Sequence, residues 1–206
     1  MGETDVLAPG RHGDGLPDGA EDWTSSGSAN NYNGKADAGE SDAAKWDTDG
    51  DGLTDGLESG VVTATRDTDL TRFAPDKDPS TTTLAADLDK DSDNDGLLDG
   101  VEDRNFDGKV ESGETDPNNT DSDGDGILDG VEDANHDGIQ EKLADGTMQE
   151  TDPLSKDSDV DGLSDGLEDA NRNGFRDKPG GVYNETDPKD SDSDKDGLRD
   201  GQETAG

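Results

Sequence analysis

The sequence predicts a mostly irregular repeat array, an extended chain with little regular helix or strand. Two observations predict this fold class. A twelve-residue acidic loop with glycine at its sixth position returns five times, which indicates a repeat architecture. The chain of 206 residues is only 24% hydrophobic and carries a formal net charge of −39. Such a composition cannot bury enough apolar surface for an ordinary core, so something else must order the chain.

The recurring loop indicates a calcium site. In residues 121–132, carboxylates stand at the first, third, fifth, ninth and twelfth positions, and Gly126 allows a sharp turn at the sixth. Ca²⁺ takes about six to eight oxygens, and this spacing supplies five side chains and the seventh-position carbonyl. These are more ligands than Mg²⁺ accepts beside its waters. The chain has no cysteine and two isolated histidines, so zinc is not expected.

All five loops carry the same ligand types, and we expect each to bind calcium. The side-chain ligands are Asp47, Asp49, Asp51, Asp55 and Glu58; Asp91, Asp93, Asp95, Asp99 and Glu102; Asp121, Asp123, Asp125, Asp129 and Glu132; Asp157, Asp159, Asp161, Asp165 and Glu168; and Asp192, Asp194, Asp196, Asp200 and Glu203. The carbonyl ligands belong to Leu53, Leu97, Ile127, Leu163 and Leu198.

A second, less acidic loop follows directly where Asp103, Asp133 and Asp169 abut the closing Glu of a strong loop. Its ligands are Asp103, Asn105, Asp107, Glu111 and Glu114 with the Lys109 carbonyl; Asp133, Asn135, Asp137 and Glu141 with the Ile139 carbonyl; Asp169, Asn171, Asn173 and Asp177 with the Phe175 carbonyl; and, near the N-terminus, Asn31, Asn33, Asp37 and Glu40. Two of these loops insert residues before Glu150 and Glu185, so their twelfth ligand stays open. Strong and second loops together predict about nine calcium ions.

The repeats divide the chain into six segments. These are a degenerate N-terminal repeat (1–46), a repeat with an atypical insertion at 59–90 (47–90), three further repeats (91–120, 121–156 and 157–191) and a C-terminal half repeat (192–206). The first loop, 10–21, keeps Asp14, Asp18 and Glu21 but lacks acids at its first and third positions. We expect weak or absent calcium binding there, and both a capping repeat and a site completed by a neighbour remain open.

The segments between the loops contain strand and turn signals. Residues 61–65 and 81–84 are β-branched and favour short strands of a hairpin, or an ordered loop. Glu-Thr-Asp-Pro recurs at 114–117, 150–153 and 185–188 and predicts a turn. Its Asp is expected to serve the turn, although a further calcium ligand stays open. Residues 76–79 read Asp-Lys-Asp-Pro and resemble a degenerate copy of this turn.

Apolar residues are few but regularly placed. The seventh-position side chains predict a thin apolar seam, and we expect the aromatic residues to cover the joints between repeats rather than to form a ligand-binding patch. Those aromatic residues are Trp23, Trp46, Tyr32, Phe106 and Phe175. Glycine at the tenth position of each strong loop (Gly56, Gly100, Gly130, Gly166 and Gly201) discourages helix beyond a single turn.

These loops resemble thrombospondin type 3 repeats, in particular the cysteine-free bacterial form. In that form Asp-x-Asp-x-Asp-Gly-Leu-x-Asp-Gly-x-Glu is separated by Thr-Asp-Pro segments, and the likeness covers about residues 10–58 and 91–203. The resemblance implies a calcium-wrapped rod, with the chain wound round rows of ions and the five strong loops as ligand sets. It also implies a calcium-dependent structural or linker role. EF-hands and dockerins differ because they need a longer helix after the loop.

We therefore expect a secreted, extracellular or cell-surface structural protein, a calcium-stiffened rod or fibre segment. The alternative is a calcium-dependent adhesion or linker module of a larger secreted protein. The sequence suggests no nucleophile–base pair of the kind that an enzyme would need. Its acidic surface would repel the phosphates of a nucleic acid, so nucleic-acid binding is not expected. No run of residues is apolar enough to span a membrane, and residues 1–5 lack the features of a signal peptide.

Two partner predictions follow from the pattern. Both ends of the chain fall inside the repeat pattern, which predicts head-to-tail self-assembly into fibres. The sequons at Asn118 and Asn184 are candidate glycan acceptors, and their occurrence by chance in a chain rich in Asn and Thr is the favoured alternative. Without calcium we expect a largely unfolded chain, because the ions would cancel about half of its negative charge.

Overall fold

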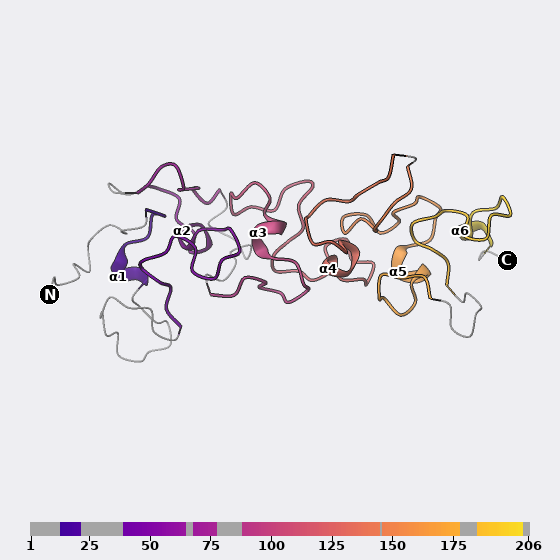
Figure 1. The fold of residues 1–206 in the computed structure, drawn as a ribbon, viewed down its shortest axis with the longest axis horizontal. Coiled ribbons are helices and arrows are strands. Elements are labelled where there is room, and N and C mark those ends of the chain that lie inside the picture. The colour runs from indigo at the N-terminus through magenta and orange to yellow at the C-terminus, as the bar shows by residue number, and fades with distance from the viewer. Residues whose placement is uncertain are drawn as a thin grey trace. The chain divides into compact units, whose positions relative to one another are not determined.

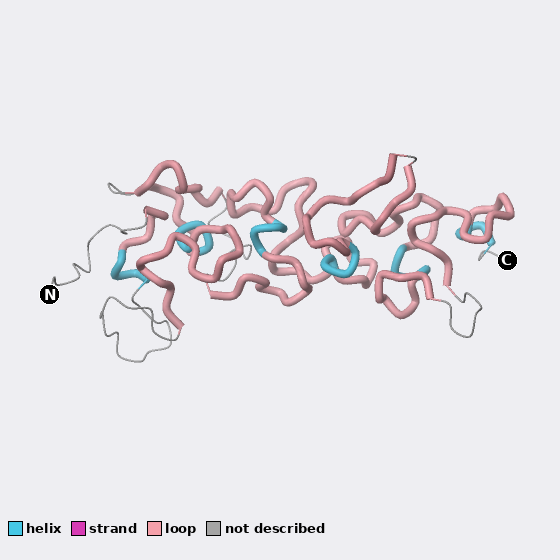
Figure 2. The backbone as a smooth tube through the Cα atoms, viewed as in Figure 1, coloured by secondary structure: helices cyan, strands magenta, loops and turns pink. Residues whose placement is uncertain are grey.

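Loops and turns make up most of the structure, a computed structural model that describes residues 13–21, 39–64, 68–77, 88–144, 146–177 and 185–203. The helices are single turns of four residues: α1 (Asp18–Glu21), α2 (Asp55–Glu58), α3 (Asp99–Glu102), α4 (Asp129–Glu132), α5 (Asp165–Glu168) and α6 (Asp200–Glu203) (Figures 1 and 2). Strand structure among the described residues consists of isolated bridge residues: Lys142 and Met148 form an antiparallel bridge, and Pro17 and Asp89 are also bridge residues. The predicted irregular fold class is confirmed.

α2 to α6 occupy the ninth to twelfth positions of the five strong loops, and α1 occupies the same positions of the degenerate loop 10–21. The eighth residue is extended, with ψ of 143° at Leu98 and Leu128, and it accepts the first helical hydrogen bonds. The turn ends at once in α3 and α4, because the next residue, Asp103 or Asp133, has ψ near 80° and opens the second loop (ψ 77° and 83°). The local sequence thus allows one helical turn and then a new loop.

Left-handed backbone shapes the loops at two positions. The sixth-position glycine has φ of 104° at Gly126 and 106° at Gly162, as the sharp turn requires. The fourth position is also left-handed, and there glycine is used at Gly50 and Gly124 but not everywhere. Val160 occupies it with φ of 62°, a conformation that a β-branched residue rarely adopts.

The chain forms two compact units. The first comprises Met1–Ser92, Leu98–Ser112 and Asp116–Asn118, and the second comprises Asp93–Leu97, Gly113–Thr115 and Asn119–Gly206. The first unit contains α1 to α3, and the second contains α4 to α6.

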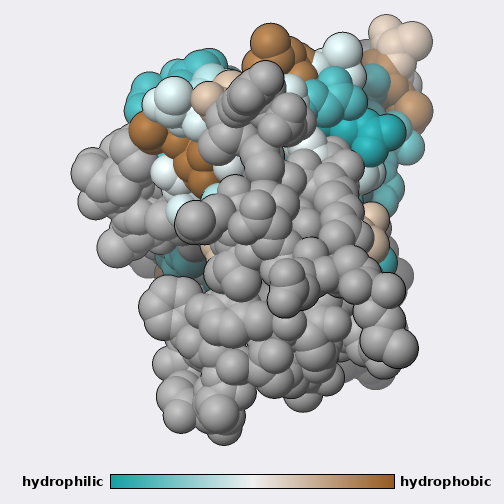
Figure 3. Space-filling model, turned by 90° about the vertical axis from the view of Figure 1, so that its left-hand side faces the viewer, coloured by the Kyte–Doolittle hydropathy of each residue, from teal (hydrophilic) through white to brown (hydrophobic). Residues whose placement is uncertain are grey.

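The predicted apolar seam is present in part. Leu53 packs with Leu57 and Ala74 in the first unit, and Leu97 and Ile127 are each buried in the second. The seam fades along the second unit, because Leu163 is half-buried and Leu198 is 50% exposed. On the face drawn in Figure 3, the coloured hydrophobic surface lies in small patches among hydrophilic surface.

The aromatic prediction holds for one joint and is wrong for another. Phe106 lies beside Gly52 of the preceding repeat, where an added Cβ would come within 3.5 Å of its ring. Phe175 is 66% exposed, so its ring is not packed at a joint between repeats as predicted. Trp46 is half-buried, with the Arg72 guanidinium 5.8 Å from its ring centroid. Trp23 and Tyr32 lie outside the described residues.

Residues 61–64 form an ordered loop, the second of the two alternatives that the sequence left open, and not a strand of a hairpin. The Val61 amide donates to the Gly56 carbonyl, and the Val61 carbonyl accepts from the Asp76 amide. These bonds fasten the insertion to the end of α2, so its backbone is not available to a sheet. Residues 81–84 lie outside the described part of the chain.

Candidate metal centre

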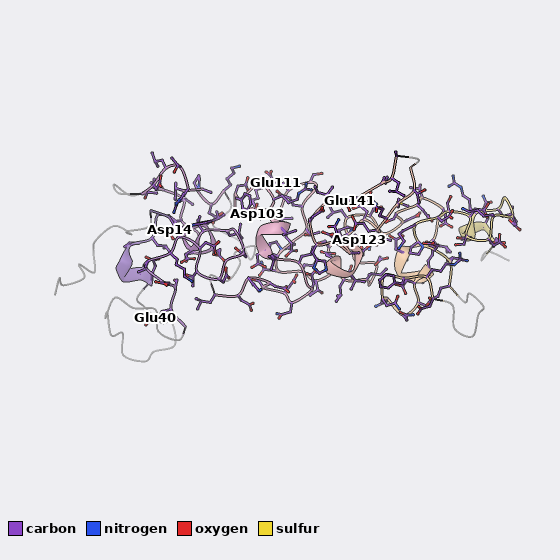
Figure 4. All side chains as sticks on the ribbon, in the orientation of Figure 1. Asp14, Glu40, Asp103, Glu111, Asp123 and Glu141 are labelled. Carbon is purple, nitrogen blue, oxygen red and sulfur yellow. The ribbon has the colours of Figure 1, made fainter. Side chains whose placement is uncertain are left out.

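Each strong loop holds its carboxylates in place with its own amides. In residues 121–132, the Gly124 amide donates to Asp121 Oδ1 at 2.8 Å, and the Ile127 amide donates to Asp125 Oδ1 at 2.8 Å. The Asp125 amide likewise donates to Asp123 Oδ1 at 3.0 Å. The other oxygen, Asp123 Oδ2, is buried and has no hydrogen-bond donor among the described residues. The amides of the loop therefore position its carboxylates, and Figure 4 labels Asp123 among the side chains that it draws.

The first, third and fifth positions form one group. Asp47, Asp49 and Asp51 each offer an oxygen, and these oxygens lie within 4.8 Å of one another. The loop at 192–203 has the same internal bonds, since Asp192 accepts from the Gly197 amide and Asp196 from the Leu198 amide. These positions are grouped as the spacing predicts.

The ninth and twelfth positions are grouped differently from the prediction of one ligand set per loop. Asp51 and Glu58 of one loop meet Asp99, the ninth residue of the following loop, and all three are buried. In the second unit, burial raises the pKa of Asp165, the ninth residue of its loop, and Asp125 of the preceding loop adds to the rise. The ninth carboxylate thus serves the preceding loop, because the helical turn that carries it packs against that loop.

A hydroxyl at the second position fixes the ninth carboxylate. The Thr48 amide and hydroxyl each donate to Asp55 at 2.7 Å, and the Ser92 amide donates to Asp99 at 2.8 Å. The same amide bond joins the second and ninth residues of the other strong loops, at Ser122, Ser158 and Ser193. Serine or threonine at this position was a sequence signal that the ligand analysis missed.

The tenth-position glycine has a role that the sequence did not reveal. An added Cβ on Gly100 would lie 2.5 Å from the carbonyl oxygen of Asp51, and one on Gly166 would lie 2.4 Å from that of Asp125. The Gly130 amide donates across the same contact to Asp95 Oδ2 at 3.2 Å. Glycine is required here because the backbone of the preceding loop approaches closely, and helix propensity is a secondary matter.

Burial and mutual repulsion raise the pKa values of these carboxylates. Burial raises the pKa of Asp51 to about 7, and Asp49, Asp99 and Asp47 add to the rise. Burial raises the pKa of Glu132 to about 9, helped by Asp123, Asp125 and Asp165 and opposed by the Thr151 hydroxyl. Glu168 behaves in the same way, with its pKa at about 9 and the Thr186 hydroxyl opposing the rise. Charged carboxylates in this arrangement call for a cation.

The second loops are closed by the glutamate of Glu-Thr-Asp-Pro. Glu150 accepts from the amides of Ala134 at 3.1 Å and Glu141 at 3.0 Å. In the same way Glu185 accepts from the Asp177 amide at 3.0 Å. The inserted residues therefore do not remove the twelfth carboxylate, which the sequence had left open.

The rest of the tetrapeptide connects successive loops. Asp152 accepts from the Leu154 amide at 3.1 Å, which is a turn bond, and its own amide donates to the Ser158 hydroxyl at 2.8 Å. Asp187 repeats both bonds with Lys189 and Ser193. The Asp thus serves the turn, as expected, and also orients the hydroxyl at the second position of the next loop.

The remaining second-loop positions are arranged as follows. Asp103 accepts from the Gly108 amide at 2.7 Å, and Asp133 accepts from the Gly138 amide at 2.6 Å. The side-chain amide of the third-position asparagine donates a hydrogen bond to a carboxylate of its own loop. These pairs are Asn105 with Glu111, Asn135 with Glu141 and Asn171 with Asp177. Glu40 is buried, whereas Asn31, Asn33 and Asp37 lie outside the described residues.

The N-terminal loop, expected to bind weakly or not at all, contains a carboxylate group. Asp14 and Glu21 meet Asp55 of the next strong loop, with all three side chains buried and the oxygens within 4.8 Å. The Gly56 amide also donates to Asp14 Oδ2 at 3.1 Å. This arrangement favours the alternative of a site completed by a neighbour over a capping repeat.

The donor set fits calcium. The groups consist of carboxylates, and Asp51, Asp129 and Asp165 each have a buried Oδ2 with no hydrogen-bond donor among the described residues. Hard oxygen donors in flexible loops are the ligands that Ca²⁺ prefers. The fifth, ninth and twelfth carboxylates would hold a cation between consecutive loops, and the first, third and fifth would hold one within a loop.

The comparisons agree with this chemistry. The family model for the bacterial TSP3 repeat matches residues 47–59, 91–105 and 121–136. No match was found among curated proteins or solved structures. The matched segments coincide with three of the five strong loops and the start of two second loops. These three segments are therefore bacterial thrombospondin type 3 repeats, which are calcium-binding repeat modules.

Proposed function

We propose that the protein is a calcium-stiffened structural module of the cell surface or extracellular space, a rod or fibre segment. The observation that carries the proposal is the carboxylate group that two loops share, Asp51 and Glu58 with Asp99. A cation held by these oxygens would tie one repeat to the next. Without it, buried like charges would face one another at the joint, which is unfavourable. Stiffness would then depend on calcium.

The location and the non-catalytic role belong to the same proposal. Thrombospondin type 3 repeats are typical of extracellular proteins, which supports the location. The described helices are too short to cross a membrane. The buried acids are spaced as metal ligands, which supports a structural rather than an enzymatic role.

Shape and order with and without calcium test the proposal. In millimolar calcium we expect small-angle scattering of an extended, rigid particle, and in EGTA we expect a disordered circular-dichroism spectrum. Bound ions favour the folded state by mass action, so the thermal midpoint should rise steeply with calcium. A fold and scattering profile that EGTA leaves unchanged would rule the proposal out.

The shared ligand can be tested at one residue. Asp99→Asn should weaken calcium binding and speed amide exchange in residues 47–58 as well as in its own loop, because its carboxylate serves the preceding loop. The matched control is Asp116→Asn, since Asp116 accepts the Asn118 amide in a turn, a bond that asparagine can also accept. Faster exchange confined to residues 91–102 would show that the Asp99 carboxylate belongs to the calcium site of its own loop and not to that of the preceding loop.

We also propose head-to-tail self-association and a glycan at Asn118. Repeat arrays bind through the same surfaces that join their own repeats, which supports assembly. Light scattering in millimolar calcium tests it, and monomers at high protein concentration would contradict it.

Asn118 is exposed, as a glycan acceptor must be, and the intact mass of the protein from its native source tests this site together with Asn184.

A further inference from the structure

A lysine from the atypical insertion at 59–90, Lys77, contacts the second loop at 103–114. Lys77 Nζ donates to Asp107 Oδ2, and the Lys77 amide donates to the Asp107 carbonyl at 2.9 Å. Asp107, the fifth position of this loop, is buried, whereas the corresponding Asp137 and Asn173 are exposed. The insertion therefore covers this loop and places an ammonium group on one of its predicted ligands.

The contact is held by the residue that precedes Lys77. Asp76 is buried, its amide donates to the Val61 carbonyl, and its carboxylate lies against Gly108. An added Cβ on Gly108 would come within 2.8 Å of Asp76 Oδ1. Because the Asp76 backbone and the Lys77 amide are both hydrogen-bonded, the ammonium remains close to Asp107 without ordering a long segment each time.

Charge makes this placement consequential. A buried carboxylate needs a compensating positive charge, and in a calcium loop that charge is the ion. At Asp107 the ammonium of Lys77 already provides it. We propose that Lys77 is an internal cation for the 103–114 loop, so that calcium must compete with it and this loop has a lower calcium affinity than the other second loops. This inference rests on the proposal that the second loops bind calcium.

The sixth-position glycine amides provide a reporter for each loop. The Gly108 amide donates to Asp103, and the Gly138 amide donates to Asp133, the opening carboxylate of a loop whose fifth residue, Asp137, is exposed. In a calcium titration of the full chain followed by NMR, the Gly108 amide should reach its midpoint at a higher calcium concentration than the Gly138 amide. Equal midpoints in the unmodified protein would overturn the proposal.

Lys77→Met tests the residue itself. It should lower the calcium midpoint of Gly108 roughly three- to tenfold and leave Gly138 unchanged. Arg104→Met is the matched control, because it removes one positive charge from the same loop at an exposed residue that is not a predicted ligand. Its effect on Gly108 should be clearly smaller.

The outcomes separate the two proposals. An equal shift in Lys77→Met and Arg104→Met would indicate a general charge effect and contradict the role of Lys77, and an unchanged Gly108 midpoint in Lys77→Met would overturn that role as well. If neither glycine amide responds to calcium at all, the second loops do not bind calcium, and that part of the proposed function fails as well.

Discussion

At the scale of single residues, the loops contain strain that is separate from metal binding. The fourth position of the strong loops is left-handed whatever residue stands there, and at Val160 it is occupied by a β-branched side chain that is 69% exposed. The side chain therefore gains little from burial while its backbone conformation is unfavourable. This position is set by the loop geometry and not by the chemistry of valine.

Val160→Gly should therefore stabilise the calcium-loaded protein by about 1 kcal/mol. The reciprocal variant, Gly50→Val, places valine at the same position of another loop, where an added Cβ meets no atom within 4 Å. It should destabilise by a similar amount, through backbone strain alone. Denaturant unfolding in saturating calcium measures both, and changes of the same sign would contradict the explanation.

At the scale of elements, the single helical turns form the backbone contacts between consecutive loops. Helix propensity alone predicts that alanine in place of Gly166 of α5 would stabilise the turn by about 1 kcal/mol. The structure predicts the opposite, because the added Cβ would lie 2.4 Å from the Asp125 carbonyl oxygen. A backbone atom cannot move aside as a flexible side chain can, so the two loops would have to separate.

Gly166→Ala should therefore destabilise the protein by about 1–3 kcal/mol, the usual range for overpacking. It should also weaken calcium binding at Asp125 and Asp165, since these carboxylates lie on the two sides of the contact. Leu167→Ala is the control within the same turn, because Leu167 is 71% exposed and its loss should matter little. Thermal unfolding in calcium distinguishes the variants, and a more stable Gly166→Ala would favour propensity over contact.

The same elements show what the sequence can and cannot predict. The spacing of Asp121, Asp123 and Asp125 within one loop identifies ligands, because neighbouring residues in a tight loop must converge. The pairing of Asp51 with Asp99 could not be predicted, since it joins residues far apart in a chain with irregular repeat lengths. Ser92, beside the first ligand of its loop, was an available clue to how the ninth carboxylate is oriented.

At the scale of the whole molecule, the balance of charges decides whether the chain folds. Glu132 and Glu168 have pKa values raised from 4.5 to about 9, because burial and neighbouring carboxylates disfavour their charge. A group with a raised pKa binds its proton more tightly in the folded chain than in the unfolded chain. Its contribution to stability is therefore present below pH 4.5 and is lost as the pH rises towards 9.

This linkage predicts that calcium reverses the pH dependence of stability. In chelator, acidification from pH 8 to pH 5 should stabilise the fold, since protons replace the missing cations on the buried carboxylates. In calcium, the same acidification should destabilise it, because protons compete with the ion for the same oxygens. The folded fraction from circular dichroism measures the slope in EGTA, and thermal midpoints measure the slope in calcium.

A general loss of negative charge on acidification would also favour compaction, so the buried glutamates need a variant of their own. Glu132→Gln with Glu168→Gln fixes both side chains in a neutral form and should flatten the chelator slope between pH 6 and pH 8. Exposed carboxylates ordinarily titrate near pH 4, and they would leave that slope unchanged. Slopes of one sign in calcium and in chelator would mean that protons and calcium do not share these sites.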